Sequence, residues 1–126
     1  MKRCWFGVFL LAALLAGSLA VTWGMDGVHR PIAQELGRAA ASAQAGAWQR
    51  AGAEFQQAQA GWEKFAHFRA CFADHTPMEA VDEELAAAGC AASLEQWPDF
   101  AAACARAAKM VAAVGDAHRL TWWNLL

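Results

Sequence analysis

Large side chains recur at helical spacing in the stretch from Trp48 to Phe72. They form two rows with a seven-residue period, namely Trp48, Phe55 and Trp62, and Ala51, Ala58, Phe65 and Phe72. Such rows define one apolar face of a helix. Because each buried aromatic side chain stabilises a fold by roughly 1.5–3 kcal/mol, other helices must cover this face. We therefore expect a helix from Trp48 to about Asp74 at the centre of a bundle.

The predicted fold class is all-α. The chain has 126 residues, of which 58% are hydrophobic, and alanine, a strong helix former, supplies much of that share. The three prolines fall near predicted helix boundaries, and no stretch alternates like a strand. We expect an N-terminal transmembrane helix, residues 1–25, followed by a domain, residues 26–126, built as an antiparallel bundle of about four helices. The predicted core residues are Trp48, Phe55, Trp62, Phe65, Phe72, Leu85 and Phe100.

Three further helices are expected around the aromatic one. The chain loosens at residues 24–27, Pro31 suits the first turn of a helix, and Gly46 marks its end. Thr76-Pro77-Met78-Glu79 resembles a capping box and predicts a helix from there to about Ser93. Pro98 suits the start of the last helix, which Gly115-Asp116 ends. The apolar tail LTWWNLL, with Trp122, Trp123, Leu125 and Leu126, is expected to dock on the bundle or on the membrane.

The first 25 residues have the composition of a membrane or export segment. Lys2 and Arg3 precede about 22 residues without a charge, which is long enough to cross a hydrocarbon layer of about 30 Å as a helix. Ser18-Leu19-Ala20 fits a signal-peptidase site, whereas the apolar residues after it favour an uncleaved anchor. We expect an anchor that contacts the lipid bilayer through residues 4–25. The short basic N-terminus favours a cytoplasmic N-terminus and an extracytoplasmic domain.

The charge distribution makes nucleic acid an unlikely partner. Beyond residue 25 the chain carries 8 basic and 12 acidic residues, and the basic ones are scattered singly. A protein that binds a phosphate backbone clusters its Lys and Arg side chains. We therefore predict no nucleic-acid partner, and the protein partner is not identified by the sequence.

A faint repeat links two parts of the chain. Trp48-x-x-Ala51-Gly52-x-x-Phe55 has the shape of the tetratricopeptide signature, and Trp97-x-x-Phe100-Ala101-x-x-Cys104 follows it 49 residues later. Stable arrays of such repeats need three or more copies. We interpret the pattern as shared packing of two helical hairpins, with a peptide-binding module as the alternative.

The landmark residues resemble those of a small bacterial family, domain-of-unknown-function family 4363. The resemblance lies in the N-terminal membrane segment, the helix from Trp48 to Trp62 that continues as WEKFAHFRACFADH, the helix that begins through His75 and Glu79, and the closing LTWWNLL. It covers nearly the whole chain. It implies a membrane-anchored helical domain outside the cytoplasm, with no assigned reaction.

His67, Cys71 and His75 are the candidate metal ligands. They follow one another at steps of four residues and would share a face if the helix continued to His75. Imidazole and thiolate suit zinc, and Asp74 or Glu79 could supply a fourth ligand. The alternative is structural: a small buried Cys71, with the two histidines at the edge of the bundle and at a helix junction. The structural alternative is favoured, so we predict no cofactor, with a metal- or haem-binding domain as the rival.

Two further groups have structural and chemical interpretations. Cys90 and Cys104 flank a predicted turn and could form a disulfide after export, although small buried cysteines are the commoner case. The acidic cluster consists of Asp74, Glu79, Asp82, Glu83 and Glu84, and we interpret it as a solvated helix face.

No catalytic set emerges from the sequence. It contains no Gly-rich phosphate loop, no G-x-S-x-G elbow and no C-x-x-C. We therefore expect a non-enzymatic protein that acts through protein contacts at the membrane.

Overall fold

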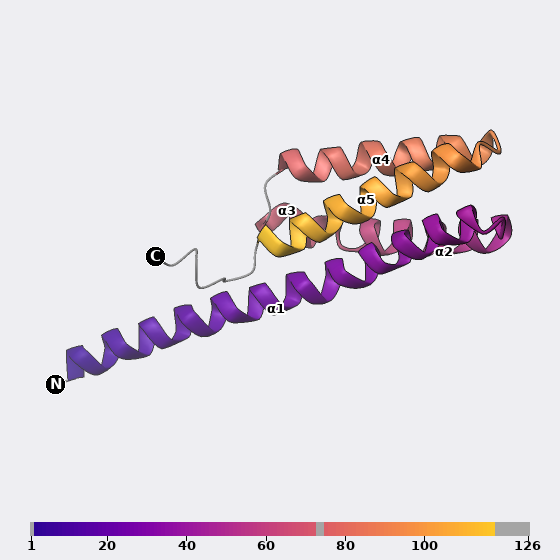
Figure 1. The fold of residues 1–126 in the computed structure, drawn as a ribbon. Helices are drawn as coiled ribbons and strands as arrows, with labels where there is room; N and C mark the ends of the chain where they lie inside the picture. The colour runs from indigo at the N-terminus through magenta and orange to yellow at the C-terminus, as the bar shows by residue number, and fades with distance from the viewer. Residues whose placement is uncertain (1, 73–74, 118–126) are drawn as a thin grey trace.

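A computed structural model describes residues 2–72 and 75–117, and within these ranges all regular structure is helical (Figure 1). The five helices are α1 (Lys2–Gln44), α2 (Trp48–Lys64), α3 (Ala66–Phe72), α4 (His75–Ser93) and α5 (Trp97–Ala117). The predicted all-α class, with a long apolar N-terminal helix and following helices packed against it, is confirmed. The tail with Trp122, Trp123, Leu125 and Leu126 lies outside the described residues, as does Asp74.

The second half of α1 forms a four-helix bundle with α2, α4 and α5. Helix α1 packs against both α2 and α5, and α4 packs against α5. The first half of α1 projects beyond this bundle as a single rod, while α3 lies at the end of the bundle from which the rod emerges (Figure 1). We call this end the base of the bundle, and the opposite end, where the α1–α2 and α4–α5 turns lie, its tip.

Two hairpins with the same turn make up the bundle. In the α1–α2 turn, Gly46 has a left-handed backbone with φ of 78°, and the Ala47 N–H donates to the Ser42 carbonyl. In the α4–α5 turn, Glu95 has φ of 57°, and the Gln96 N–H donates to the Ala91 carbonyl. Both are Schellman-type helix ends. Their positions differ by the 49 residues that separate Trp48 from Trp97, so the sequence repeat corresponds to a repeated backbone structure.

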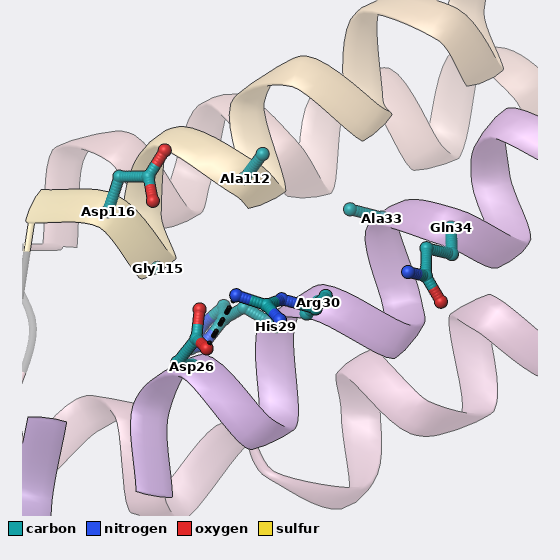
Figure 2. Close-up of a pocket in the computed structure, with 8 residues that line it drawn as sticks. All are labelled: Asp26, His29, Arg30, Ala33, Gln34, Ala112, Gly115 and Asp116. Carbon is teal, nitrogen blue, oxygen red and sulfur yellow. Dashed lines mark ion pairs between the residues drawn. The ribbon is translucent and has the colours of Figure 1, made fainter. Parts of the chain in front are cut away.

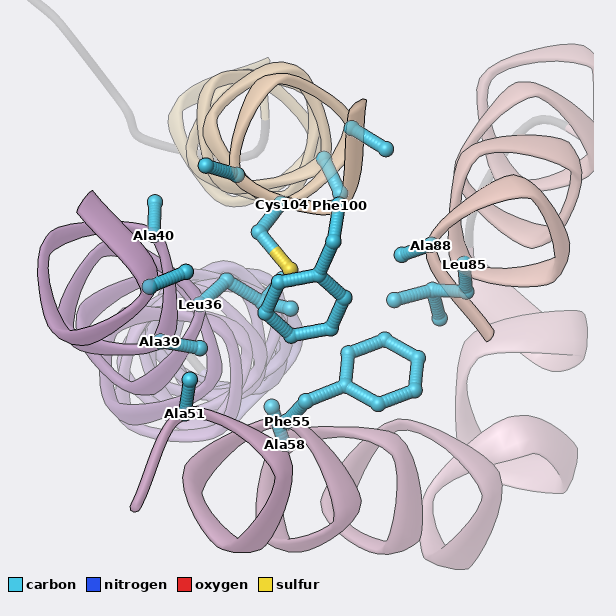
Figure 3. Packing of buried hydrophobic residues seen from close by; sticks show 14 of the residues in the cluster. Leu36, Ala39, Ala40, Ala51, Phe55, Ala58, Leu85, Ala88, Phe100 and Cys104 are labelled. Carbon is cyan, nitrogen blue, oxygen red and sulfur yellow. The ribbon is translucent and has the colours of Figure 1, made fainter. Parts of the chain in front are cut away.

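The core is a layer of alanines around two phenyl rings. Phe55 and Phe100 meet edge to face, with ring centroids 5.5 Å apart, among Leu36, Leu85 and Cys104 (Figure 3). Of the predicted core residues, Phe55, Trp62, Leu85 and Phe100 are buried. The small side chains of Ala39, Ala51, Ala58, Ala88 and Ala107 allow the helices to approach closely.

Two predicted core aromatics are less buried than the others. Trp48 is 43% exposed because it lies at the tip, where its indole stacks on that of Trp97. Phe65 is half-buried. The side chain of Phe72 is not among those that the structure describes.

The predicted break at residues 24–27 is wrong. Helix α1 continues through Gly24 and Gly27, and Pro31 lies inside it rather than in a first turn. Each glycine costs a helix about 1 kcal/mol, and a proline costs about 3 kcal/mol. Burial of Met25 and Ile32 on the same face offsets this cost, since an interrupted helix could not bury both against the bundle.

The aromatic helix ends earlier than predicted. Helix α2 stops at Lys64, two residues after Trp62, which is its last buried residue. The chain continues as the separate helix α3 instead of running on to Asp74. At the other end of the chain, α5 passes through the predicted break at Gly115 and ends at Ala117.

Candidate functional site

The projecting half of α1 is an apolar rod, defined here as residues 4–22. Every residue from 4 to 20 is exposed. The large side chains among them are Trp5, Phe6, Val8, Phe9, Leu10, Leu11, Leu14, Leu15 and Leu19. This surface is far more apolar than a soluble protein exposes to water. The helix that contains the rod is long and apolar enough to cross a membrane, which is also a property of an export signal.

The few polar side chains of the rod are compatible with lipid. The Thr22 hydroxyl donates to the carbonyl of Ser18 at 2.9 Å, one helical turn earlier. Such a bond satisfies a hydroxyl within its own helix. The backbone of the rod is helical throughout, so beyond the first turn its N–H and C=O groups also pair internally, as a hydrocarbon environment requires.

Burial begins abruptly at Met25, where α1 enters the bundle. Four residues later His29 is only 1% exposed, and its Nδ1 lies 2.6 Å from the Met25 carbonyl oxygen. Its ring meets the Trp62 indole edge to face at 6.0 Å. Gly115 of α5 passes so close that a Cβ there would lie 3.1 Å from the His29 Cβ. The imidazole is therefore held between three helices.

His29 is not one of the predicted site or core residues. Met25, His29, Ile32 and Leu36 follow the spacing of a buried helix face, and this spacing was the available signal. The predicted break at residues 24–27 concealed it, because it placed Met25 and His29 outside the first helix of the bundle.

A pocket of about 340 Å³ opens beside His29, between α1 and α5 at the base (Figure 2). It is lined by Asp26, His29, Arg30, Ala33, Gln34, Ala112, Gly115 and Asp116. Arg30 and Asp26 form an ion pair at 2.9 Å. The eight include one histidine and two carboxylates, those of Asp26 and Asp116, and no Ser, Thr, Cys or Lys side chain.

The three candidate metal ligands do not share a helix. Helix α3 ends at Phe72, and His75 begins α4. His67 and Cys71 are exposed on α3, whereas the side chain of His75 lies outside what the structure describes. In the described part of the chain, no three His, Cys, Asp or Glu side chains come together in a way that could hold a metal ion.

Cys90 and Cys104 both have free thiols, so the disulfide considered between them is absent. Cys90 is exposed on the outer face of α4, whereas Cys104 points into the core from α5. Burial raises the pKa of the Cys104 thiol to about 12, because the apolar core disfavours the thiolate. Two cysteines on faces that point in different directions cannot reach disulfide geometry.

Two members of the acidic cluster hold helices together. Asp82 accepts a hydrogen bond from the Trp62 indole N–H at 2.6 Å, which joins α4 to α2. Glu84 accepts one from Arg106 of α5 at 3.0 Å, and this contact raises the pKa of the arginine. Glu79, Asp82 and Glu83 are exposed, as a solvated helix face requires, whereas Glu84 is half-buried.

The two tryptophans of the repeat, Trp48 and Trp97, are in contact with each other. The Trp48 and Trp97 rings are stacked at 5.0 Å with planes 13° apart. Trp97 also meets Phe100 edge to face. A peptide-binding groove between Trp48 and Trp97 would require the two rings to be separated, and in this structure they are in contact.

Together these features define a class: a four-helix bundle of two like hairpins, whose first helix extends as a rod with a membrane-compatible surface. Searches with this chain find no matching protein-family model, no matching curated protein and no matching solved structure.

Proposed function

We propose that the protein is a membrane-anchored, extracytoplasmic, non-enzymatic helical protein that acts through protein contacts. The observation that carries the proposal is the continuity of α1. One uninterrupted helix has an exposed apolar first half and a second half that forms a wall of the bundle core. The anchor and the domain are therefore joined without a flexible linker.

The charges around the rod support an N-terminus in the cytoplasm. Lys2 and Arg3 precede the rod, and the first 25 residues contain no acid. A short basic N-terminus followed by an exported domain is the common arrangement for a signal-anchor. The landmark residues resemble those of domain-of-unknown-function family 4363, and on that resemblance we propose membership of the family, which implies the same topology.

The surface supports a role in protein contact rather than chemistry. At the tip, Trp48 and Leu94 are both exposed, the latter by 62%. Along α4, Glu83 belongs to the exposed acidic residues. An exposed aromatic side chain at the tip and exposed acidic groups along α4 suit a partner with apolar and basic surface.

Mass spectrometry of the protein from washed cell membranes tests the anchor. We expect a chain that retains its first 20 residues and stays with the membranes after an alkaline wash. A soluble product that begins at Val21 would instead show that the segment is a cleaved export signal. The orientation is tested with an export-dependent reporter fused either after residue 117 or before residue 2. We expect activity only from the fusion after residue 117. Activity only from the fusion before residue 2 would show the opposite orientation.

Photo-crosslinking in cells tests the partner surface. A photoreactive amino acid at Glu83 or Leu94 is expected to give one defined protein adduct. The matched control is Gln57, an exposed residue on a different helix, α2. Adducts of the same pattern from all three positions would show only random collisions and would contradict a specific contact surface.

A further inference from the structure

The pocket at the base of the bundle lies directly beyond the apolar rod. The uncharged residues 4–25 rise by about 33 Å at 1.5 Å per residue, which matches a hydrocarbon core of about 30 Å. Asp26, the next residue, lines the pocket. Trp23 is 77% exposed, and tryptophan side chains concentrate at the membrane interface. With the rod across a bilayer, the pocket therefore lies at the level of the lipid headgroups.

Two side chains of opposite charge meet in this pocket. Asp26 and Arg30 lie one helical turn apart on α1, and the guanidinium reaches back along the helix to the carboxylate, at 2.9 Å (Figure 2). Both charged groups are therefore at one depth. The side chain of Arg30 is 59% exposed and that of Asp26 is 33% exposed. Because a guanidinium has five N–H donors and a carboxylate has two acceptor oxygens, this ion pair leaves both groups able to bind a ligand.

Small residues of α1 and α5 leave the space beside this ion pair. Ala33 lines the pocket from α1, and Ala112 and Gly115 line it from α5. The volume of about 340 Å³ is at the lower end of the range of about 300–1,000 Å³ that small-molecule sites occupy. A pocket of this size suits one small polar group, such as a lipid headgroup, rather than a peptide or a whole lipid.

We propose that this pocket binds the phosphoethanolamine headgroup of a phospholipid in the leaflet from which α1 emerges. The phosphate accepts hydrogen bonds from the Arg30 guanidinium, and the ammonium donates to the Asp26 carboxylate. The inference rests on the proposed membrane anchor, and the experiment below separates the two.

The ion pair favours this headgroup over two other common ones. Asp26 and Arg30 together are neutral, as is a phosphoethanolamine group, so each charge of the ligand meets a charge of opposite sign. A phosphoglycerol headgroup would bring a negative charge next to Asp26 without an ammonium to offset it. A choline headgroup has no N–H to donate to the carboxylate. Selectivity among the three headgroups is therefore the property to measure.

Native mass spectrometry of the full-length protein in detergent micelles measures this selectivity. The protein is incubated with equal amounts of phosphatidylethanolamine, phosphatidylcholine and phosphatidylglycerol that carry identical acyl chains. We expect one phosphatidylethanolamine adduct, with an affinity about tenfold above that of either other lipid, because each of them lacks the charge-assisted hydrogen bond to Asp26.

Two substitutions separate the roles of the two charges. Arg30→Gln should weaken phosphatidylethanolamine binding about tenfold, because the phosphate loses its charged donor. Asp26→Asn should make phosphatidylglycerol bind at least as tightly as phosphatidylethanolamine, since the guanidinium then meets the anionic headgroup without a carboxylate beside it. A residue that only stabilised the fold would not change the order of lipid preference.

The matched control is Arg38→Gln. Arg38 pairs with Glu35 on the same helix, its side chain is 57% exposed, and it lies outside the pocket. This substitution removes one exposed arginine from an ion pair, as Arg30→Gln does, and it should leave both the affinity and the order of preference unchanged. Circular dichroism of each variant checks that the helices remain folded.

Flotation with vesicles of phosphatidylcholine and phosphatidylethanolamine reports the anchor separately. Protein that floats with the vesicles but binds the three lipids equally would leave the anchor in place and remove the headgroup site. Protein that does not float would remove the anchor, and the inference with it.

A soluble form of the headgroup distinguishes the source of the ligand. Glycerophosphoethanolamine, which carries no acyl chains, should not displace phosphatidylethanolamine at equal concentration. If it bound as tightly as the lipid, the pocket would take a soluble zwitterion, and its assignment to a membrane lipid would be wrong.

Discussion

The two hairpins of the bundle, α1–α2 and α4–α5, have the same backbone structure at their turns but different core side chains. Their turns have the same hydrogen bonds, and buried positions recur 49 residues apart, as in Leu36 and Leu85, or Ala58 and Ala107. The phenylalanine in the second helix of each hairpin, α2 or α5, nevertheless lies at a different position. The first hairpin has Ala51 followed by Phe55, whereas the second has Phe100 followed by Cys104.

This difference shows that the hairpins are complementary rather than interchangeable. Phe55 and Phe100 come from positions one helical turn apart, so their rings can meet edge to face without competing for one space. The small residues Ala51 and Cys104, which occupy the equivalent positions of the other hairpin, are also fully buried. Alternation of large and small side chains fills a core at normal density. A repeat of identical hairpins would place two rings at one level and leave another level empty.

The largest expected effect comes from removing one of the two rings. Phe100→Ala should lower the free energy of unfolding by about 3–5 kcal/mol, because Phe100 is fully buried. At the equivalent position of the first hairpin, Ala51→Phe should lower it by about 1–3 kcal/mol through overpacking. Urea unfolding followed by circular dichroism measures both. If Ala51→Phe were neutral, the hairpins would be interchangeable and the comparison would fail.

The second prediction concerns alkaline pH. The pKa of Cys104 is raised from the ordinary value of 9.0 to about 12, so between these values the folded protein holds a proton that the unfolded chain releases. Stability from this group is therefore complete below about pH 9 and falls as pH rises toward 12, by at most about 1.4 kcal/mol per pH unit.

Urea unfolding over this pH range measures the loss. Cys104→Ala should show a shallower decline than the natural chain, whereas Cys90→Ala, which removes an exposed thiol, should follow the natural chain. Equal slopes for all three proteins would mean that the Cys104 thiol is not shielded from water.

Substitutions in the two turns should change the free energy of unfolding by smaller amounts and in opposite directions. Gly46 and Glu95 occupy the same left-handed position, which a glycine adopts freely and a side chain adopts at a cost. Gly46→Ala should therefore lower the free energy of unfolding by about 1 kcal/mol, and Glu95→Gly should raise it by up to about 1 kcal/mol. Thermal unfolding detects both shifts. Two changes of the same sign would show that the turns are not equivalent.

The smallest expected effect comes from the part of α1 that the second hairpin lacks. Helix α4 begins at His75, whose counterpart in the first hairpin is Asp26, and the residues before Asp26 are an addition to the repeated unit. Deletion of residues 2–20 should leave the Tm of the bundle unchanged, because residues 4–20 are exposed. Calorimetry of the shortened chain tests this, and a clearly lower Tm would mean that the rod stabilises the bundle.

Much of the bundle could be predicted from periodicity. The inward positions of α4, such as Val81 and Leu85, follow directly from the spacing of apolar residues, as does the buried stripe of α2 up to Trp62. The continuity of α1 could not be predicted in this way. Gly24, Gly27 and Pro31 signal a break locally, and only the burial of side chains on both sides of them favours an unbroken helix.

The candidate site depended more strongly on contacts between distant residues. The apolar rod is evident from composition alone, and the structure adds that its surface is exposed. His29 is buried because Trp62 of α2 and Gly115 of α5 pack against it. The metal hypothesis for His67, Cys71 and His75 requires one helix that continues to His75. This condition is not met, because α3 ends at Phe72.

The sequence by itself determined the helical class, the apolar uncharged stretch that could enter a membrane, and the approximate limits of four helices, because periodicity and charge are local properties of a chain. The tertiary structure decided which helices pair, that His29 is buried, that Asp82 and Glu84 serve other helices, and that α3 lies level with Gly24. These features arise from contacts between residues far apart in the chain, and the free energy of burying them together is large enough to override local preferences for a break or a turn.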